Sequence, residues 1–252
     1  VSQPSSSSFV YMQNANAIRN NEWYHIVFVL RTNSFELYRN GVLLKTASIT
    51  ELPNNSSSFI YLGGTLTSYN FNGIIDEFAL WNTPLSSSEI LQIYNKQNTK
   101  FGGSYVSPVT SFPANSNLRF SKWISTLPFY KELPGDTDAN ATPDSETSAE
   151  YSGISTNLSS NLVGLWHFDE SAYSGASYEL KDSSGGGHHG RRSTAGSQAF
   201  VSSPLGRGII GPTIFNIAST DLPDLSNTFT YSFWMRSTDI NSNYSTIVYR
   251  IN

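Results

Sequence analysis

Two strand-rich segments, separated by a stretch of different composition, constrain this fold most. Residues 1–97 finish with a strand, a turn and a short helix (FNGIIDEFALWNTPLSSSEILQIYNKQ, 71–97), a common way for a β-sandwich domain to end. Residues 161–252 start with LVGLWHFDE (162–170) and continue to FTYSFWMRST (229–238). The first segment therefore reads as the end of a β-domain and the second as the beginning of one. Neither segment carries enough strands to close a sheet alone, so each needs a complement.

Short apolar runs rich in Val, Ile, Phe, Tyr and Trp, with turn signals between them, predict an antiparallel β-sandwich. Strands are expected at 9–14, 22–31, 34–39, 42–49, 59–63 and 73–81, and again at 162–169, 176–181, 208–217, 228–237 and 244–251. The run 23–30 is apolar on both faces, which predicts a central strand that is covered on both sides. Asn40-Gly41 predicts a hairpin, because both residues accept the positive φ of a type I′ turn.

One helix and a connector complete the organisation. Residues 86–96 are expected to be helical, with N-cap candidates from Ser86 to Ser88. The connector spans 98–160. Its part 117–133 is aromatic and is expected to dock on a neighbouring domain, whereas 135–153 is acidic, rich in Ser and Thr, and is expected to be a flexible linker.

Composition narrows the function classes. The net charge is −4 and no long Lys/Arg run occurs, so neither nucleic acid nor an anionic membrane surface is an expected partner. No apolar run reaches the roughly 18 residues of a membrane span, and the absence of cysteine excludes disulfides and thiolate zinc sites. A charged fraction of 13% and zero cysteine fit an extracellular, exported bacterial protein. The start, VSQPSSSSFV, resembles an internal cut or a mature end, with any export signal upstream.

Ordered motifs in both segments resemble the laminin-G-like, concanavalin-A-like jelly rolls found in tandem on bacterial surface proteins. The beginning of such a domain is similar to LVGLWHFDE, KDSSGGGHHG, PLGRGIIGPTIF and NTFTYSFWMRS, and its end to NEWYHIVFV, FELYRNGVLL, FIYLGG and FNGIIDEFALWNTPLSSSEI. The two sets stand in inverted order. The resemblance implies an all-β, antiparallel jelly-roll sandwich built from two complementary half-domains, 1–97 and 161–252.

Three arrangements satisfy this complementarity. The chain is one register-shifted period of a tandem array, a circularly permuted single domain, or a subunit that completes itself with a neighbour's half and forms a fibre. The expected partners are therefore adjacent repeats or neighbouring copies of the chain. The aromatic part of the connector favours the array or the exchange between copies.

Asp76 is the main candidate metal ligand. In a regular strand Asp76 shares a face with Ile74 and Phe78, while Glu77 points the other way. A carboxylate among apolar neighbours needs a partner. The resemblance implies a structural Ca²⁺ held by this aspartate, with Asp169 as the second carboxylate, and backbone carbonyls supply most of the remaining oxygens. A third ligand is expected among the glycine carbonyls near Gly206 or Gly208. The alternative is that Asp76 caps backbone amides or pairs with a basic side chain.

The sequence predicts a protein that is not an enzyme. Glycoside hydrolysis needs two carboxyls at a defined separation, and the pairs Asp76-Glu77 and Asp169-Glu170 are adjacent, so each pair is expected to face opposite ways. The alternative function is a carbohydrate-active enzyme, a glycosidase or lyase, on the same scaffold. His188-His189 is expected in an exposed Gly-rich turn rather than in a metal site.

The remaining histidines, His25 and His167, are expected at the edge of the core with one hydrogen bond each. Glycan binding is supported through the fold. Loop residues that could contact a sugar are Tyr69, Asn70, Asn72, Tyr173 and Tyr244. The predicted function is a non-catalytic adhesion or surface-fibre module, with glycans as possible ligands.

Overall fold

The structure is a computed structural model of the chain. It describes residues 18–49, 59–64, 71–98, 158, 160–170, 179–192, 200–211, 215–218, 222, 228–239 and 247–250. Several predictions lie outside these residues. They are the strand at 9–14, the docked and flexible parts of the connector (117–133 and 135–153), and the ligand candidates Tyr69, Asn70, Tyr173 and Tyr244.

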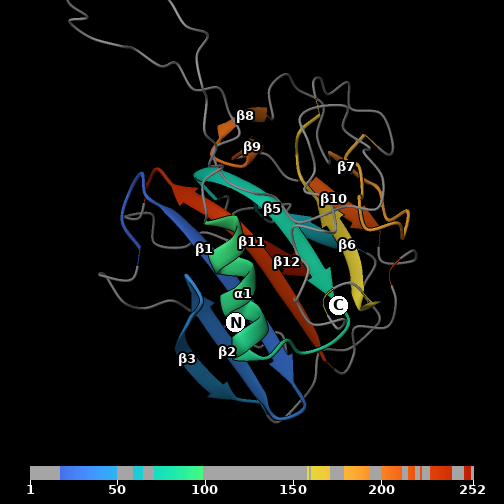
Figure 1. Cartoon of the computed structure of the whole chain (residues 1–252). Coiled ribbons are helices and arrows are strands. Elements are labelled where there is room, and N and C mark those ends of the chain that lie inside the picture. The colour runs from blue at the N-terminus through green and yellow to red at the C-terminus, as the bar shows by residue number, and fades with distance from the viewer. Residues whose placement is uncertain are drawn as a thin grey trace, which may run out of the picture.

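The described strands form two antiparallel sheets, whose strands are drawn as arrows in Figure 1. The larger, eight-stranded sheet has the order β3-β2-β1-β11-β5-β9-β8, with β6 also paired to β5. Its strands are β1 (Trp23–Arg31), β2 (Ser34–Arg39), β3 (Val42–Ser48), β5 (Gly73–Trp81), β6 (Leu162–Trp166), β8 (Phe200–Ser203), β9 (Gly206–Ile210) and β11 (Phe229–Ser237). The smaller sheet, β12-β4-β10-β7, consists of β4 (Phe59–Leu62), β7 (Gly190–Arg192), β10 (Phe215–Ala218) and β12 (Val248–Arg250).

Strands from the two sequence segments alternate in both sheets. In the larger sheet β11, from the second segment, lies between β1 and β5, from the first (Figure 1). The residue pairing of β1 with β11 is continuous from Trp23 opposite Arg236 to Leu30 opposite Phe229. In the smaller sheet β4 lies between β12 and β10. The two segments therefore pair within one chain, and exchange of halves between copies stays a prediction.

The main core lies between the two sheets. It contains buried residues of the larger sheet (Ile26, Leu30, Leu37, Ile75, Phe78, Phe233 and Met235) and of the smaller sheet (Ile60, Leu62, Phe215 and Ile217). Phe78 is at its centre, with ring centroids 5.6 Å from those of Trp166 and Tyr231. Aromatic packing of this kind adds to the free energy of burying apolar area. This core confirms the predicted sandwich.

A helix covers the outer face of the larger sheet. Helix α1 (Ser87–Gln97) follows β5 directly, and its Ile90 and Ile93 pack with Val27, Val29, Ala79, Trp81 and Leu165 in a second apolar cluster. Ser86 caps the helix, accepting from the backbone N–H of Glu89, whose carboxylate returns to the Ser86 N–H at 2.7 Å. Figure 1 shows α1 in front of β1 and β11. The predicted helix and its N-cap are confirmed. No helix within the described residues is long and apolar enough to cross a membrane.

The strand predictions differ from the structure mainly in the second segment. The stretch 208–217, expected as one strand, is divided between β9 in the larger sheet and β10 in the smaller one. Of the stretch expected as a strand at 176–181 the structure describes residues 179–181, where Leu180 forms an isolated bridge with Gly190. Strands β7 and β8 were not predicted, because three or four residues carry too short a pattern. The central position of β1, between β2 and β11, is confirmed.

Candidate functional site

A β-bulge in β5 decides where its two carboxylates point. The pairing of β5 with β11 shifts between Ser232 and Trp234, and Glu77 has a φ of +52°. Ile75 and Phe78 both contribute to the core between the sheets, although regular alternation would place them on opposite faces. The extra residue therefore reverses the alternation, as bulges do.

The prediction that Asp76 and Glu77 face opposite ways is wrong for this reason. Asp76 is opposite Trp234, whose ring stacks on Tyr94 of α1, so Asp76 points to the helix-covered face. Glu77 points to the same face, because its carboxylate contacts Gln97 of α1. Phe78 points to the opposite face, into the core. Both carboxylates are buried under the helix-covered side of the larger sheet.

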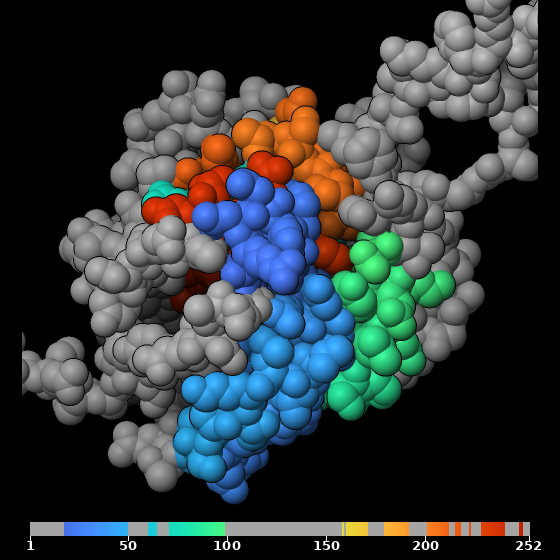
Figure 2. Space-filling model, turned by 90° about the vertical axis from the view of Figure 1, so that its left-hand side faces the viewer, coloured from blue at the N-terminus to red at the C-terminus, as the bar shows by residue number. Residues whose placement is uncertain are grey.

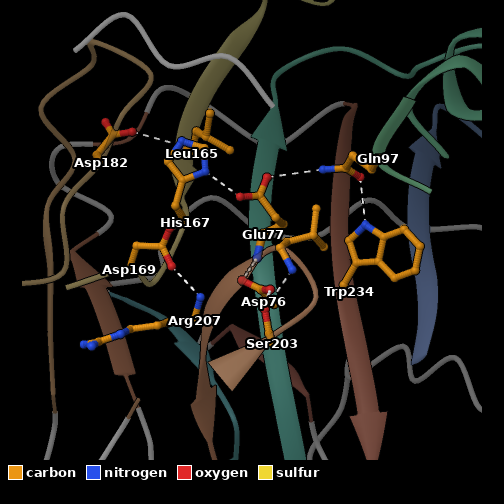
Figure 3. Close-up of polar contacts among 11 residues, drawn as sticks. Asp76, Glu77, Gln97, Leu165, His167, Asp169, Asp182, Ser203, Arg207 and Trp234 are labelled. Atoms are coloured by element: carbon orange, nitrogen blue, oxygen red, sulfur yellow. Dashed lines mark hydrogen bonds and ion pairs between the residues drawn. The ribbon is translucent and has the colours of Figure 1, made fainter. Parts of the chain in front are cut away.

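The Glu77 carboxylate joins three separate elements (Figure 3). One oxygen lies 2.5 Å from Nδ1 of His167, in the segment after β6, and the other accepts from the Gln97 amide at 3.2 Å. The Gln97 oxygen in turn accepts from the indole N–H of Trp234 at 2.9 Å. Glu77 therefore ties the end of α1 to β11 and to the chain that leaves β6.

Asp76 has backbone and hydroxyl partners. Its Oδ1 accepts from the backbone N–H of Glu77 at 2.8 Å, and its Oδ2 accepts from the hydroxyl of Ser203 on β8 (Figure 3). The side chain is fully buried. Burial, together with the charges of Glu77 and Asp169, raises the pKa of Asp76 well above its usual value. The structure thus shows the amide-capping arrangement that the sequence left open as an alternative.

Asp169 lies against the beginning of β9. Its Oδ1 accepts from the backbone N–H of Arg207 at 2.5 Å (Figure 3). A Cβ atom added to Gly206 would lie 2.5 and 2.6 Å from the two Asp169 oxygens, and Gly206 has a φ of +128°. Glycine is therefore required at this position for two reasons, space and backbone conformation. Gly208 adjoins Asp76, because its Cβ would lie 3.4 Å from the Asp76 Cβ.

The predicted metal-site residues therefore lie close together. The pKa values of two neighbouring titratable residues, His167 and Glu170, are raised. Burial lowers the pKa of His167, but the charge and hydrogen bond of Glu77 and the charges of Asp169 and Glu170 outweigh it, so that the pKa is raised. Burial raises the pKa of Glu170 to about 7, although its carboxylate accepts from the Lys181 backbone N–H at 2.7 Å. We call Asp76, Glu77, His167, Asp169 and Glu170 the acidic cluster.

The chemistry of the acidic cluster fits a hard cation in part. Asp76 and Asp169 offer carboxylate oxygens beside glycine backbone, which are the donors that calcium prefers. Within the described residues, however, no three or more His, Asp or Glu side chains are arranged to hold a metal ion. A calcium ion here would take most of its oxygens from the backbone and from water. Calcium therefore stays a prediction.

Asp182 is a structural residue that the sequence reasoning did not single out. Its carboxylate accepts from the backbone N–H groups of Leu165, Ser184 and His188, each at 2.9 Å. The motif Asp-Ser-Ser-Gly was the available signal, since aspartate commonly accepts from backbone N–H groups a few residues on. The Gly-rich turn that follows holds His188 and His189 partly buried rather than exposed, and Nδ1 of His189 accepts from the Asp182 N–H at 3.0 Å.

The remaining predicted residues have backbone or packing roles. The Asn72 carbonyl accepts from the backbone N–H of Thr238 at 2.9 Å and from its hydroxyl at 3.1 Å, which holds the end of β11. His25 is fully buried under α1, and its Nε2 lies 2.8 Å from the Ser232 hydroxyl. Its position is central rather than at the edge of the core, because β1 lies in the middle of the larger sheet.

Comparison with protein families gives a match in the first segment. Residues 2–91 match the family model Laminin_G_3, described as the concanavalin A-like lectin/glucanases superfamily. No curated protein and no solved structure gives a significant match. The matched stretch contains β1 to β5, and the antiparallel sheets completed by the second segment are those of a concanavalin A-like β-sandwich.

Proposed function

We propose that this protein is a non-catalytic, glycan-binding module that serves adhesion or the architecture of a surface fibre. The concanavalin A-like fold supports a carbohydrate-binding role, although a fold alone does not determine function. The observation that carries the non-catalytic part is the burial of the two acidic residues of β5. Asp76 and Glu77, whose side chains point to the same face of the sheet, are 0% and 1% exposed.

Glycoside hydrolysis needs one carboxyl on each side of a bound sugar, with space between them for the glycosidic bond. In the acidic cluster Glu77 is instead held by His167 and Gln97, and Asp76 by Ser203 and a backbone N–H. These contacts occupy the oxygens that catalysis would use. The carboxylates therefore serve to join β5, β8, α1 and the segment after β6.

The alternative, a glycosidase or lyase, has one observation in its favour. A pKa of about 7 for Glu170 is in the range suited to a general acid at neutral pH. A glycan array combined with a hydrolysis screen separates the two functions. Binding without turnover supports the proposal. Turnover of any polysaccharide that disappears in both Glu170→Gln and Glu77→Gln contradicts it, with Glu36→Gln on β2 as the matched control.

The proposed setting is the surface of a bacterium, with adjacent repeats or neighbouring copies of the chain as protein partners. The low charge, the absence of cysteine and the inverted order of the halves support this setting. Light scattering after size-exclusion chromatography tests the partner part. Oligomers whose size grows with concentration support exchange between copies, whereas a concentration-independent monomer restricts the partners to adjacent repeats of a longer protein.

The proposed calcium ion would be held by Asp76 and Asp169, with Gly206 supplying a backbone carbonyl. These residues come from both sequence segments, so a bound ion would stabilise the joined sandwich. Two neighbouring carboxylates, Asp76 buried and Asp169 partly buried, repel each other, and a divalent cation would remove this repulsion.

A further inference from the structure

A cationic side chain without an acidic partner stands beside a partly exposed indole at one end of the larger sheet. Arg236 on β11 makes no ion pair and no side-chain hydrogen bond within the described residues, and its Nε is buried without a hydrogen-bond partner. Its guanidinium carbon lies 5.8 Å from the centroid of the Trp23 ring. Both side chains are only partly buried. Figure 2 shows the beginning of β1, in dark blue, next to red residues of the second segment at the surface.

The contact with Trp23 leaves the Arg236 guanidinium able to bind a ligand. A cation–π contact operates within about 6 Å of the ring centroid, so at 5.8 Å the contact is at its outer limit. Such a contact gives the five N–H donors of the guanidinium no oxygen acceptor. An unsatisfied donor on a partly buried cation is costly. A ligand that brings acceptors to Arg236 would remove that cost.

A second arginine–aromatic pair, formed by Arg39 on β2 and Tyr24 on β1, has nearly the same separation but a buried aromatic residue. Arg39 lies 5.7 Å from the Tyr24 ring centroid. Tyr24 is 7% exposed, and its hydroxyl donates to Glu22 at 2.6 Å and accepts from the backbone N–H of Arg19 at 3.1 Å. The Tyr24 pair is therefore a packed structural contact, whereas the Trp23 pair keeps an accessible ring and a guanidinium with free donors.

The sheet holds the Trp23–Arg236 pair in a fixed position. Arg236 is directly opposite Trp23 on β1 and opposite Ile74 on β5. Its strand, β11, lies between β1 and β5 in the middle of the larger sheet, and the neighbouring Trp234 is fixed by its hydrogen bond to Gln97. Side chains that project from central strands lose little freedom on binding, which favours affinity.

We propose that Trp23 and Arg236 form a subsite for a carboxylated sugar, a uronic acid unit of an acidic glycan. This inference rests on the proposed glycan-binding function and names its ligand class. A guanidinium matches a carboxylate with two parallel N–H···O bonds, and such charge-assisted bonds are about twice as strong as neutral ones. The indole offers an apolar surface for the C–H face of the sugar ring, and polar groups beside an aromatic surface are typical of small-ligand sites.

The test uses the whole chain and matched pairs of oligosaccharides. Tetramers of galacturonic, glucuronic, mannuronic and guluronic acid are titrated by calorimetry, each beside its own methyl ester, which removes the charge. We expect at least one acid to bind tenfold or more tightly than its ester. Raising the salt concentration should weaken binding of the acid and leave that of the ester unchanged, because screening acts on charges.

Substitutions assign the effect to the two residues. Arg236→Gln should lower the affinity for the acid at least tenfold and leave that for the ester unchanged, and Arg236→Lys, which keeps the charge without the planar fork, should lie in between. Trp23→Ala should weaken the acid and the ester alike. Arg39→Gln is the matched control and should have no effect. Melting curves establish that each variant is folded, and the salt series on the unsubstituted protein gives a readout that needs no variant.

If no glycan binds at all, the proposed function and this subsite both fail. If glycans bind but every acid equals its ester, or Arg236→Gln changes nothing, the subsite is wrong and the proposed function stands. If a tetraglutamate peptide binds as tightly as the acidic sugars and with the same dependence on Arg236, the site recognises carboxylates without a sugar, and the proposal is overturned.

Discussion

His25 and Glu77 lie on the same face of the larger sheet, and the protein buries them in two different ways. His25 is surrounded by the rings of Tyr94 and Trp234, at 6.0 and 5.4 Å between centroids, and has the Ser232 hydroxyl as its polar partner. Glu77 instead has the titratable groups of the acidic cluster around it. Trp234 separates the two regions, since its ring faces His25 and its N–H binds Gln97.

The difference shows how the surroundings of a buried group determine its charge. Burial alone lowers the pKa of His25 to about 3, so this imidazole stays neutral. His167 is also buried, yet its pKa is raised because Glu77 and the neighbouring acids favour the imidazolium. An isolated group thus gives up its charge, while a group with an opposite charge at hydrogen-bond distance keeps it.

The largest effect that tests this comparison is expected for Glu77→Ala. The substitution leaves His167 and Gln97 without their shared acceptor, and breaking a buried ion pair from one side costs about 3–5 kcal/mol. Urea unfolding measures the loss. The control is Glu36→Gln, which removes a partly exposed ion pair with Arg31 (N–O 2.9 Å) and should cost less than about 1 kcal/mol. Equal losses in the two variants would mean that the buried contacts of Glu77 stabilise the protein no more than a partly exposed ion pair does.

Calcium is expected to act on the acidic cluster and not on His25. At a concentration 100 times its dissociation constant, a ligand that binds only the native state stabilises it by about 2.7 kcal/mol. We expect added calcium to raise the melting temperature and excess chelator to reverse the rise. Asp76→Asn and Asp169→Asn should abolish the shift, and Glu36→Gln should retain it. An identical melting curve with and without calcium would refute the prediction.

Acid is expected to weaken the protein through His25. The unfolded state binds a proton near the ordinary pKa of about 6.5, and the folded state does so only near pH 3. The unfolded state therefore binds more protons between these values, and stability falls as the pH is lowered through this window. One such group contributes a loss of about 2 kcal/mol at pH 5 relative to pH 8. Comparing urea midpoints of the protein and of His25→Gln isolates this part, and parallel pH profiles would contradict it.

The smallest effect concerns the helix that covers both regions. Ser86→Ala removes the N-cap of α1, which typically costs about 1 kcal/mol. Because α1 packs over His25 and also carries Gln97, the loss should add to that of His25→Gln without changing the pH profile. Ser88→Ala, in the exposed first turn, is the control and should have almost no effect. A loss much larger than about 1 kcal/mol in Ser86→Ala would show that the start of the helix, rather than the sheet, determines the surroundings of both His25 and Glu77.

The sequence predicted the first segment better than the second, and the reason lies in pattern length. The nine residues of β5, GIIDEFALW, are mostly apolar and lie between turn residues, which was enough to predict its bounds, 73–81, as the structure has them. The stretch 208–217 carries the same kind of apolar residues, but the chain leaves one sheet and enters the other within it. Such a change depends on which strands are available as partners, and those strands are far away in the sequence.

Only part of the acidic cluster was predicted: Asp76 and Asp169 were expected as ligands, whereas Glu77, His167 and Glu170 were not expected to join them. Asp76, Asp169 and Gly206 were identified from motifs, and the structure places them together. The bulge at Glu77 could not be predicted, because a positive φ at a glutamate has no signal in the residue type, unlike Gly41 in its hairpin. That one conformation moves Glu77 and Asp76 to the same face and produces the contacts with His167 and Gln97.

The alternation of strands from the two segments also has a consequence for synthesis on the ribosome. β1 and β5 are complete once residue 81 has been made, but β11, which lies between them, is complete only at residue 237. At the usual rate of about 5–20 residues per second, roughly 8–30 seconds pass between these events. During that interval the edges of β1 and β5 that β11 will later join have no partner in the nascent chain, so chaperone capture should act on this protein mainly while it is still being translated.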